Sequence, residues 1–464
     1  MVGVKAWLSA PVLIAILVCI THAGEAVAPG QDMPEEGYRL AWKLPVGDLM
    51  SAAISHDGQR ILLPVHSDGH YLYDSNGRLI WRLPDPRAKF GALSADGSSV
   101  VLASGDRVSS IDARTLQEEW NYTLPSDLDS MSMSDDGSLV AVSGVWTNHT
   151  FIYTFDSQGN QLWKQSIEAE ELGDLHVFLY VHANLAVSDD GSYIAAAMRE
   201  TSARYGSFIC VGRNGVILFD KEGRLAWNFT TSECVSNVAI SEGGRHVAAG
   251  SDSHVYVFAI GGQLLWSRPV DHGVVAVSKR GERFVGGDAG GALLLGNSSG
   301  PYWEMDVDGS VDSVAVSERG DISASIISRD SPDGRTVRLI YVLTDTGRLI
   351  GNYSFVAPTH APSYERANRV AISGDGCCIV AALETDGIYY FVRIPAGTQT
   401  LATATGTETL TVSTSTTTPS RPGAEEIQII TMAILVVTVG LIALLFAVRR
   451  ISRPRIRVES RPAT

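Results

Sequence analysis

A four-residue pattern, Ser-x-x-Gly, recurs eight times along the chain, and each copy follows a short apolar segment. Successive copies begin 37 to 56 residues apart, and their serines are Ser55, Ser94, Ser134, Ser188, Ser241, Ser278, Ser317 and Ser373. A unit of this length that recurs in tandem cannot bury its own apolar surface, so it must stack on its neighbours. The pattern therefore predicts a repeat architecture with eight units.

Tryptophan marks a second position of the repeat. Seven of the nine tryptophans share one phase of the repeat: Trp42, Trp81, Trp120, Trp163, Trp227, Trp266 and Trp303. Gly351 occupies this position in the remaining unit. A polar residue follows each of these positions, and successive side chains of a strand point to opposite faces. We therefore expect each tryptophan to pack between units, as a blade-packing residue, while its neighbour faces solvent.

Each unit contains four short segments with strand character, separated by Gly and Asp. In the second unit these segments are Phe90–Ser94, Ser99–Ala103, Arg107–Asp112 and Glu118–Leu124. Four-stranded units of this kind, arranged around an axis, form a β-propeller. One further strand, Tyr38–Leu44, precedes the first unit, and the last unit ends at Ile394 one strand short. We predict an all-β, eight-bladed β-propeller over residues 38–395, in which the N-terminal strand completes the last blade and removes the open edge.

The blade ends carry the pattern Asp-x-x-Gly-x-x-x-Trp, from Asp74 to Trp81 and from Asp220 to Trp227. This pattern resembles the pyrroloquinoline-quinone-type (PQQ-like) repeat of the quinoprotein alcohol dehydrogenase-like propellers. The chain is also similar to the tryptophan–aspartate-repeat (WD-repeat-like) propellers, although it lacks the Gly-His and Trp-Asp pairs of that family. The resemblance implies the propeller fold, and it implies an exported quinoprotein oxidoreductase as an alternative function, because propellers host many activities.

The two ends of the chain predict a membrane-anchored protein. Residues 1–23 have the charged start, apolar middle and small-residue cleavage site of a signal peptide. Residues 427–448 carry no charge and are long enough for one transmembrane helix, and the Arg-rich residues 449–464 favour the cytoplasmic side. Between ring and membrane, the Ser/Thr-rich residues 396–424 predict a stalk without a core. We therefore expect a single-pass protein of the cell membrane, with an extracellular N-terminal ectodomain and a cytoplasmic tail.

Five sequons, Asn-x-Ser/Thr, offer candidate glycosylation sites at Asn121, Asn148, Asn228, Asn297 and Asn352. Three of them directly follow the tryptophan position of the repeat, where we expect the side chain to face solvent.

Four cysteines remain after the leader. Cys210 and Cys234 flank two strands of the fourth blade, and they form either a disulfide or two buried thiols. Cys377 and Cys378 lie at the start of a strand of the last blade, where one of them faces the core.

Insertions in the repeat fall where the second strand leads to the third or where one blade leads to the next. They are Ile167–His182, Arg199–Gly215, Ser328–Thr336 and Phe355–Asn368. Both kinds of connection emerge on one face of a propeller, and variable loops on a rigid scaffold commonly bind partners. The candidate contacts on this binding face are Glu170, Glu171, His176, Tyr180, Arg204, Tyr205, His360, Tyr364 and Arg366. The alternative is that these loops only cover the core.

The sequence contains no Gly-x-Ser-x-Gly elbow, HExxH motif or P-loop, and we predict no catalytic, cofactor-binding or metal-binding residue. A net charge of −15 disfavours nucleic acid as a partner, because phosphate binding needs basic patches. The leading hypothesis is a non-catalytic module for recognition, adhesion or scaffolding that binds an extracellular protein or glycan. The alternative, the quinoprotein oxidoreductase, requires a tryptophan near the axis to stack on its cofactor and carboxylate ligands for calcium.

Overall fold

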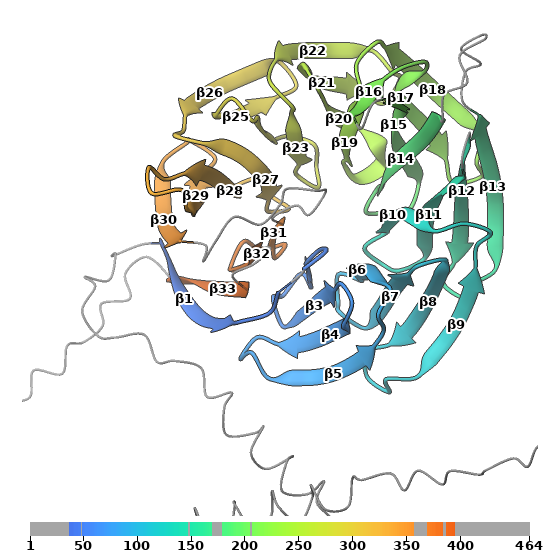
Figure 1. Ribbon diagram of the computed structural model, residues 1–464, viewed down its shortest axis with the longest axis horizontal. Coiled ribbons are helices and arrows are strands. Elements are labelled where there is room, and N and C mark those ends of the chain that lie inside the picture. Colours follow the sequence, from blue (N-terminus) through green and yellow to red (C-terminus); the bar gives the residue numbers. More distant parts are fainter. Residues whose placement is uncertain are drawn as a thin grey trace, which may run out of the picture. The chain divides into compact units, whose positions relative to one another are not determined.

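The computed structural model describes residues 37–47, 49–146, 149–168, 179–204, 207–356, 369–383 and 387–394. Eight antiparallel sheets are arranged around a common axis, with the first strand of each blade innermost (Figure 1). Seven sheets have four strands, and the fourth blade has a fifth strand that pairs with the end of its second strand. The predicted eight-bladed, all-β propeller is therefore confirmed.

The strands of blades 1 to 4 are as follows. Blade 1 contains β2 (Ala53–Ile54), β3 (Arg60–Val65), β4 (Gly69–Asp74) and β5 (Leu79–Pro84). Blade 2 contains β6 (Ala88–Leu93), β7 (Ser99–Ser104), β8 (Arg107–Asp112) and β9 (Glu118–Thr123). Blade 3 contains β10 (Leu128–Met133), β11 (Leu139–Trp146), β12 (His149–Asp156) and β13 (Gln161–Glu168). Blade 4 contains β14 (Leu179–Val187), β15 (Tyr193–Arg204), β16 (Ser207–Cys210), β17 (Asn214–Asp220) and β18 (Leu225–Thr231).

The remaining blades repeat the same order. Blade 5 contains β19 (Val235–Ile240), β20 (His246–Ser251), β21 (His254–Ala259) and β22 (Leu264–Pro269), with a short 3-10 turn, η1 (Glu242–Gly244). Blade 6 contains β23 (Val274–Val277), β24 (Phe284–Gly287), β25 (Ala292–Asn297) and β26 (Gly300–Asp306). Blade 7 contains β27 (Ser310–Val316), β28 (Ile322–Asp330), β29 (Thr336–Thr344) and β30 (Leu349–Val356). Blade 8 contains β31 (Arg369–Ile372), β32 (Cys378–Leu383), β33 (Gly387–Ile394) and β1 (Gly37–Leu44).

The ring is closed by the N-terminal strand, as the repeat count predicts. Strand β1 pairs antiparallel with β33 from Gly37 opposite Ile394 to Leu44 opposite Ile388 (Figure 1). The buried Tyr38 donates a hydrogen bond from its hydroxyl to a turn of blade 8, and it accepts one at its carbonyl oxygen from Tyr353 of blade 7. The closing strand is thus bonded both to its own blade and to the preceding one.

The repeated tryptophans join neighbouring blades. Trp42 donates a hydrogen bond from Nε1 to the Ser75 carbonyl oxygen in the turn before the last strand of blade 1, at 2.9 Å. Trp227 does the same to Ile260 of blade 5, at 2.7 Å. A Cβ added at Gly77 would lie 3.0 Å from the Trp42 ring, so the turn needs glycine both for its positive φ and for this contact. Trp120, Trp163 and Trp266 make the same hydrogen bond, so these indoles tie neighbouring blades together.

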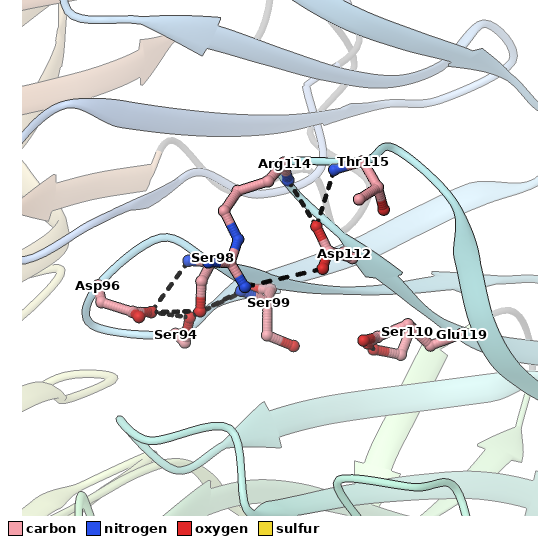
Figure 2. Close-up of polar contacts among 9 residues, drawn as sticks. All are labelled: Ser94, Asp96, Ser98, Ser99, Ser110, Asp112, Arg114, Thr115 and Glu119. Atoms are coloured by element: carbon pink, nitrogen blue, oxygen red, sulfur yellow. Dashed lines mark hydrogen bonds and ion pairs between the residues drawn. The ribbon is translucent and has the colours of Figure 1, made fainter.

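The Ser-x-x-Gly turns are held by the serine hydroxyl, which is fully buried in every copy. In blade 2, Ser94 Oγ accepts the Ser99 backbone N–H at 2.9 Å and donates to Asp96 at 2.7 Å (Figure 2). Asp96 also accepts the Ser98 N–H, and Gly97 has a positive φ of 66°. The hydroxyl thus satisfies a backbone donor that a four-residue turn would leave buried and unpaired, which explains why serine recurs here.

The predicted membrane anatomy concerns residues outside this ring. The signal peptide (1–23), the stalk (396–424), the transmembrane helix (427–448) and the basic tail (449–464) all lie outside the described residues. Across the part of the chain that the structure describes, no helix has both the length and the apolar character needed to cross a bilayer.

Candidate functional site

The antiparallel order of the blades gives the propeller two different faces. Turns between the first and second strands, and between the third and fourth, lie on one face, which we call the plain face. Connections from the second to the third strand, and from blade to blade, lie on the other, which we call the loop-rich face. The Ser-x-x-Gly turns belong to the plain face, and the predicted insertions belong to the loop-rich face.

Two predicted insertions on the loop-rich face are built from paired strands and are not irregular loops. Within Arg199–Gly215, β15 continues beyond its pairing with β17 and pairs with β16 in a side hairpin. The segment Ser328–Thr336 is the end of the β28–β29 hairpin, which is paired to its last residues. Strands β28 and β29 have nine residues each, against six in the equivalent β20. This hairpin therefore extends about 10 Å farther from the ring.

A disulfide fixes the side hairpin of blade 4 to the next blade. Cys210 at the end of β16 is bonded to Cys234, which directly precedes β19 of blade 5, and their Cα atoms are 5.6 Å apart. Asp252 lies beside the pair. Because sulfur atoms in a disulfide have no thiolate to offer, this group is not a metal site while the bond is intact.

The predicted contact residues fall mostly outside the described part of the chain. Those outside are Glu170, Glu171, His176, Tyr205, His360, Tyr364 and Arg366. Tyr180 lies near the start of β14, opposite Thr201, and Arg204 ends β15, opposite Ser207. Both positions are at the loop-rich end of blade 4.

The candidate glycosylation sites lie largely on the outer strands. Asn121, Asn228 and Asn352 are exposed, as expected for residues that follow the tryptophan position. Asn297 is half-buried, and Asn148 lies outside the described residues. Three sequons therefore present an asparagine that a glycosylating enzyme could reach.

The plain face carries a ring of residues at the axis that the repeat pattern alone did not reveal. These residues directly follow the serine of each turn: His56, Ala95, Asp135, Asp189, Glu242, Lys279, Glu318 and Gly374. Seven of the eight neighbouring pairs are joined by a backbone N–H that donates to the carbonyl oxygen of the next blade, at 2.7 to 3.1 Å. Between blades 4 and 5, the Gly243 N–H donates instead to the Asp190 carboxylate at 3.1 Å. This continuous belt of hydrogen bonds ties all eight blades together.

Lys279 bridges this ring across the axis. Its Nζ lies 2.6 Å from an Asp135 oxygen of blade 3 and 2.7 Å from a Glu318 oxygen of blade 7. His56 of blade 1 lies 2.9 Å from the same Glu318 carboxylate. One ammonium group therefore links blades that are far apart in sequence. We call His56, Asp135, Asp189, Lys279 and Glu318 the axial cluster.

The charges in the axial cluster perturb its ionisation. Burial, together with the Asp135 carboxylate, raises the pKa of Asp189 to about 7. Burial opposes protonation of Lys279, but its hydrogen bonds to Asp135 and Glu318 raise the pKa of this amine above its ordinary value. His56, Asp135 and Glu318 are spaced so that they could share a metal ion, but the Lys279 ammonium already contacts both carboxylates. The cluster is therefore an ion-pair network that links blades 1, 3, 6 and 7 at the axis.

The described residues do not fit a quinone cofactor. The repeated tryptophans lie on outer strands in the seams between blades, and Trp146, at the end of β11, is 46% exposed. None of these described indoles lies at the axis, where a stacking partner is needed. Among the acidic residues that follow β26, Asp308 pairs with Arg329 at 2.6 Å and Asp312 lies 3.7 Å from Arg338. These carboxylates are matched with arginines and do not converge on one cation.

Solved structures with the same fold are distant in sequence. "Structure of Dos1 propeller" is 12% identical with a TM-score of 0.52, and the alignment covers 77% of this chain and 94% of that one. The C-terminal WD40 domain of Sif2 is 14% identical with a TM-score of 0.56, covering 78% of this chain and 99% of that one. These likenesses concern the fold alone, and no curated protein matches the chain.

The repeat pattern itself has a family-level match. The model of the family described as outer membrane protein assembly factor BamB matches residues 148–381, which is half of the chain. The matched region runs from blade 3 into blade 8 and contains the disulfide, both hairpins and most of the axial cluster. The chain therefore belongs to this family of PQQ-type repeat propellers.

Proposed function

We propose that this chain is a cell-surface, single-pass membrane protein whose propeller recognises or scaffolds an extracellular protein or glycan through its loop-rich face, without catalysing a reaction. The observation that carries the proposal is the difference between the two faces. The plain face is uniform and tightly hydrogen-bonded, whereas the loop-rich face bears extended hairpins that differ from blade to blade.

The hairpins on the loop-rich face are held in place. The side hairpin of blade 4 is bonded to blade 5 through Cys210 and Cys234. At the base of the blade 7 hairpin, Ser328 donates a hydrogen bond to the Asp312 carboxylate and accepts one from Arg338. A preorganised surface loses less conformational entropy on binding than a mobile loop does, which favours recognition by this face.

The location is supported by the chemistry of the chain. A structural disulfide suits an oxidising compartment. The leader, the uncharged segment 427–448 and the Arg-rich tail have the order expected of a single-pass protein. The description of the family as an outer membrane protein assembly factor is in keeping with a scaffolding role at a membrane.

The test is a capture experiment with the soluble ectodomain, residues 25–397, on native membranes. One variant replaces Asp330, Asp333 and Arg335 at the blade 7 hairpin with alanine. A matched control replaces Arg114 and Glu222, exposed on plain-face turns, with alanine. We expect the hairpin variant to lose a partner that the native ectodomain and the control retain. Equal capture by both variants would refute recognition through this hairpin, and loss only in the control would place binding on the plain face.

A further inference from the structure

Two adjacent cysteines meet in the plain-face turn of blade 8. The Sγ atoms of Cys377 and Cys378 are 2.7 Å apart, between the bonded distance of about 2.05 Å and ordinary contact. The Cys377 N–H donates to Asp375 at 2.9 Å, and the Cys378 N–H donates to Ser373 Oγ at 2.9 Å. These hydrogen bonds fix the backbone N–H groups of both cysteines. The two sulfur atoms are therefore held against one another.

The pair lies where the ring is closed. A Cβ added at Gly58 of blade 1 would lie 2.6 Å from the Cys378 sulfur. Tyr390 of blade 8 donates a hydrogen bond to the Gly58 carbonyl oxygen at 2.9 Å and stacks on Trp42 of the closing strand, with ring centroids 4.9 Å apart. Cys378 is buried in this seam, whereas Cys377 is half-buried, so Cys377 is the more exposed of the two residues.

We propose that Cys377 and Cys378 form a reversible adjacent disulfide, a redox-sensitive site at the seam between blades 8 and 1. The oxidant is a small-molecule or protein disulfide. Cys377, as the thiolate, attacks it, forms a mixed disulfide and releases one thiolate. Cys378, as the thiolate, then attacks the Cys377 sulfur and releases the second. One S–S bond is broken and one is formed, and the two cysteine protons leave on the two released thiols. The second attack is intramolecular, because the two sulfur atoms lie 2.7 Å apart.

The adjacent bond must be easier to reduce than the other disulfide of the chain. Consecutive Cα atoms lie about 3.8 Å apart, below the usual disulfide range of about 4.4–6.8 Å, and such departures make a disulfide more reducible. The Cα atoms of Cys210 and Cys234, at 5.6 Å, lie within that range. The second disulfide is therefore an internal reference for the first, and the prediction does not depend on what the loop-rich face binds.

The test uses the ectodomain secreted into an oxidising compartment and purified without reductant. Trypsin releases residues 370–393 as one peptide that carries both adjacent cysteines. We expect this peptide to be lighter than its reduced form by two hydrogen atoms. In a titration with reduced glutathione it should gain alkylatable thiols before the Cys210–Cys234 pair does. Two free thiols after incubation with excess oxidised glutathione would overturn the proposal, and so would reduction no easier than that of the reference pair.

A second measurement tests the link to ring closure. Mild reduction should shift the thermal midpoint of the native ectodomain but not that of the double variant Cys377→Ser/Cys378→Ser. If the variant fails to fold, limited proteolysis of the native protein replaces it, with faster cleavage near β1 expected after mild reduction. Identical midpoints, or identical cleavage, in both redox states would show that the pair does not act on the seam.

Discussion

Acidification should loosen the seam between blades 1 and 2 through one buried histidine. His70 in β4 is 0% exposed, and its Nε2 lies 2.9 Å from Ser104 Oγ of blade 2. Its Nδ1 is buried and has no hydrogen-bond partner among the described residues. Burial lowers the pKa of His70 to about 4, so the folded state resists protonation. The contribution of the neutral imidazole to the free energy of unfolding is complete above the unfolded-state pKa of about 6.5. It is lost as pH falls from there toward 4.

The magnitude follows from the two pKa values. Between pH 7 and pH 5, linkage gives a loss of about 2 kcal/mol in the free energy of unfolding, rising toward about 3 kcal/mol below pH 4. The assay is urea unfolding of the ectodomain at pH 7 and pH 5, for the native chain and for His70→Gln. We expect His70→Gln to be less stable at pH 7, because it weakens the seam, but to lose about 2 kcal/mol less on acidification.

The control for the histidine prediction is His272→Gln, a substitution at an exposed side chain in the link between blades 5 and 6. This variant should lose as much free energy of unfolding between pH 7 and pH 5 as the native chain does. If His70→Gln loses as much stability as the native chain between these pH values, the buried histidine is not the acid-sensitive group and the reasoning fails.

Other predictions concern the axis, the seams, the closure and the glycans. Burial raises the pKa of Asp189 to about 7, so its ionisation lowers the free energy of unfolding as pH rises toward 7. Asp189→Asn should therefore stabilise the ectodomain at pH 8 and not at pH 4. The control is Asp306→Asn at an exposed position, which should change stability equally at both pH values. Trp227→Phe loses an inter-blade hydrogen bond and should cost about 1–2 kcal/mol in urea unfolding. Deleting residues 25–44 exposes the β33 edge and should produce aggregates in size-exclusion chromatography. Asn352→Gln should increase gel mobility by one glycan in a glycosylating host.

The ring could be predicted from the sequence because its signals are local and recur. Each Ser-x-x-Gly turn closes within six residues, since the Ser94 hydroxyl bonds the Ser99 N–H, so every copy carries its own complete pattern. The tryptophan position repeats for the same reason, because the contact between Trp42 and Gly77 recurs at Gly159, Gly223, Gly262 and Gly347. Counting these positions was enough to predict that the strand at Tyr38 completes the last blade.

The axial cluster could not be predicted in this way. Lys279 and Asp135 are separated by 144 residues, and only the closed ring brings them together. The sequence signal that could have indicated the axial cluster is the position after each serine, where charged residues such as Asp189 and Glu318 recur. The alternation of side chains along a strand does not show which residues face the axis. The sequence predicts a loop at Arg199–Gly215, but the segment is largely a hairpin, because β15 continues past the blade and pairs with β16.

The most direct test of recognition through the loop-rich face is hydrogen–deuterium exchange of the ectodomain with and without its captured partner. The account predicts slower exchange in the hairpins at residues 199–211 and 328–336, with no change in the turns at residues 55–58 and 317–320. Protection confined to those plain-face turns, with both hairpins unchanged, would contradict the account.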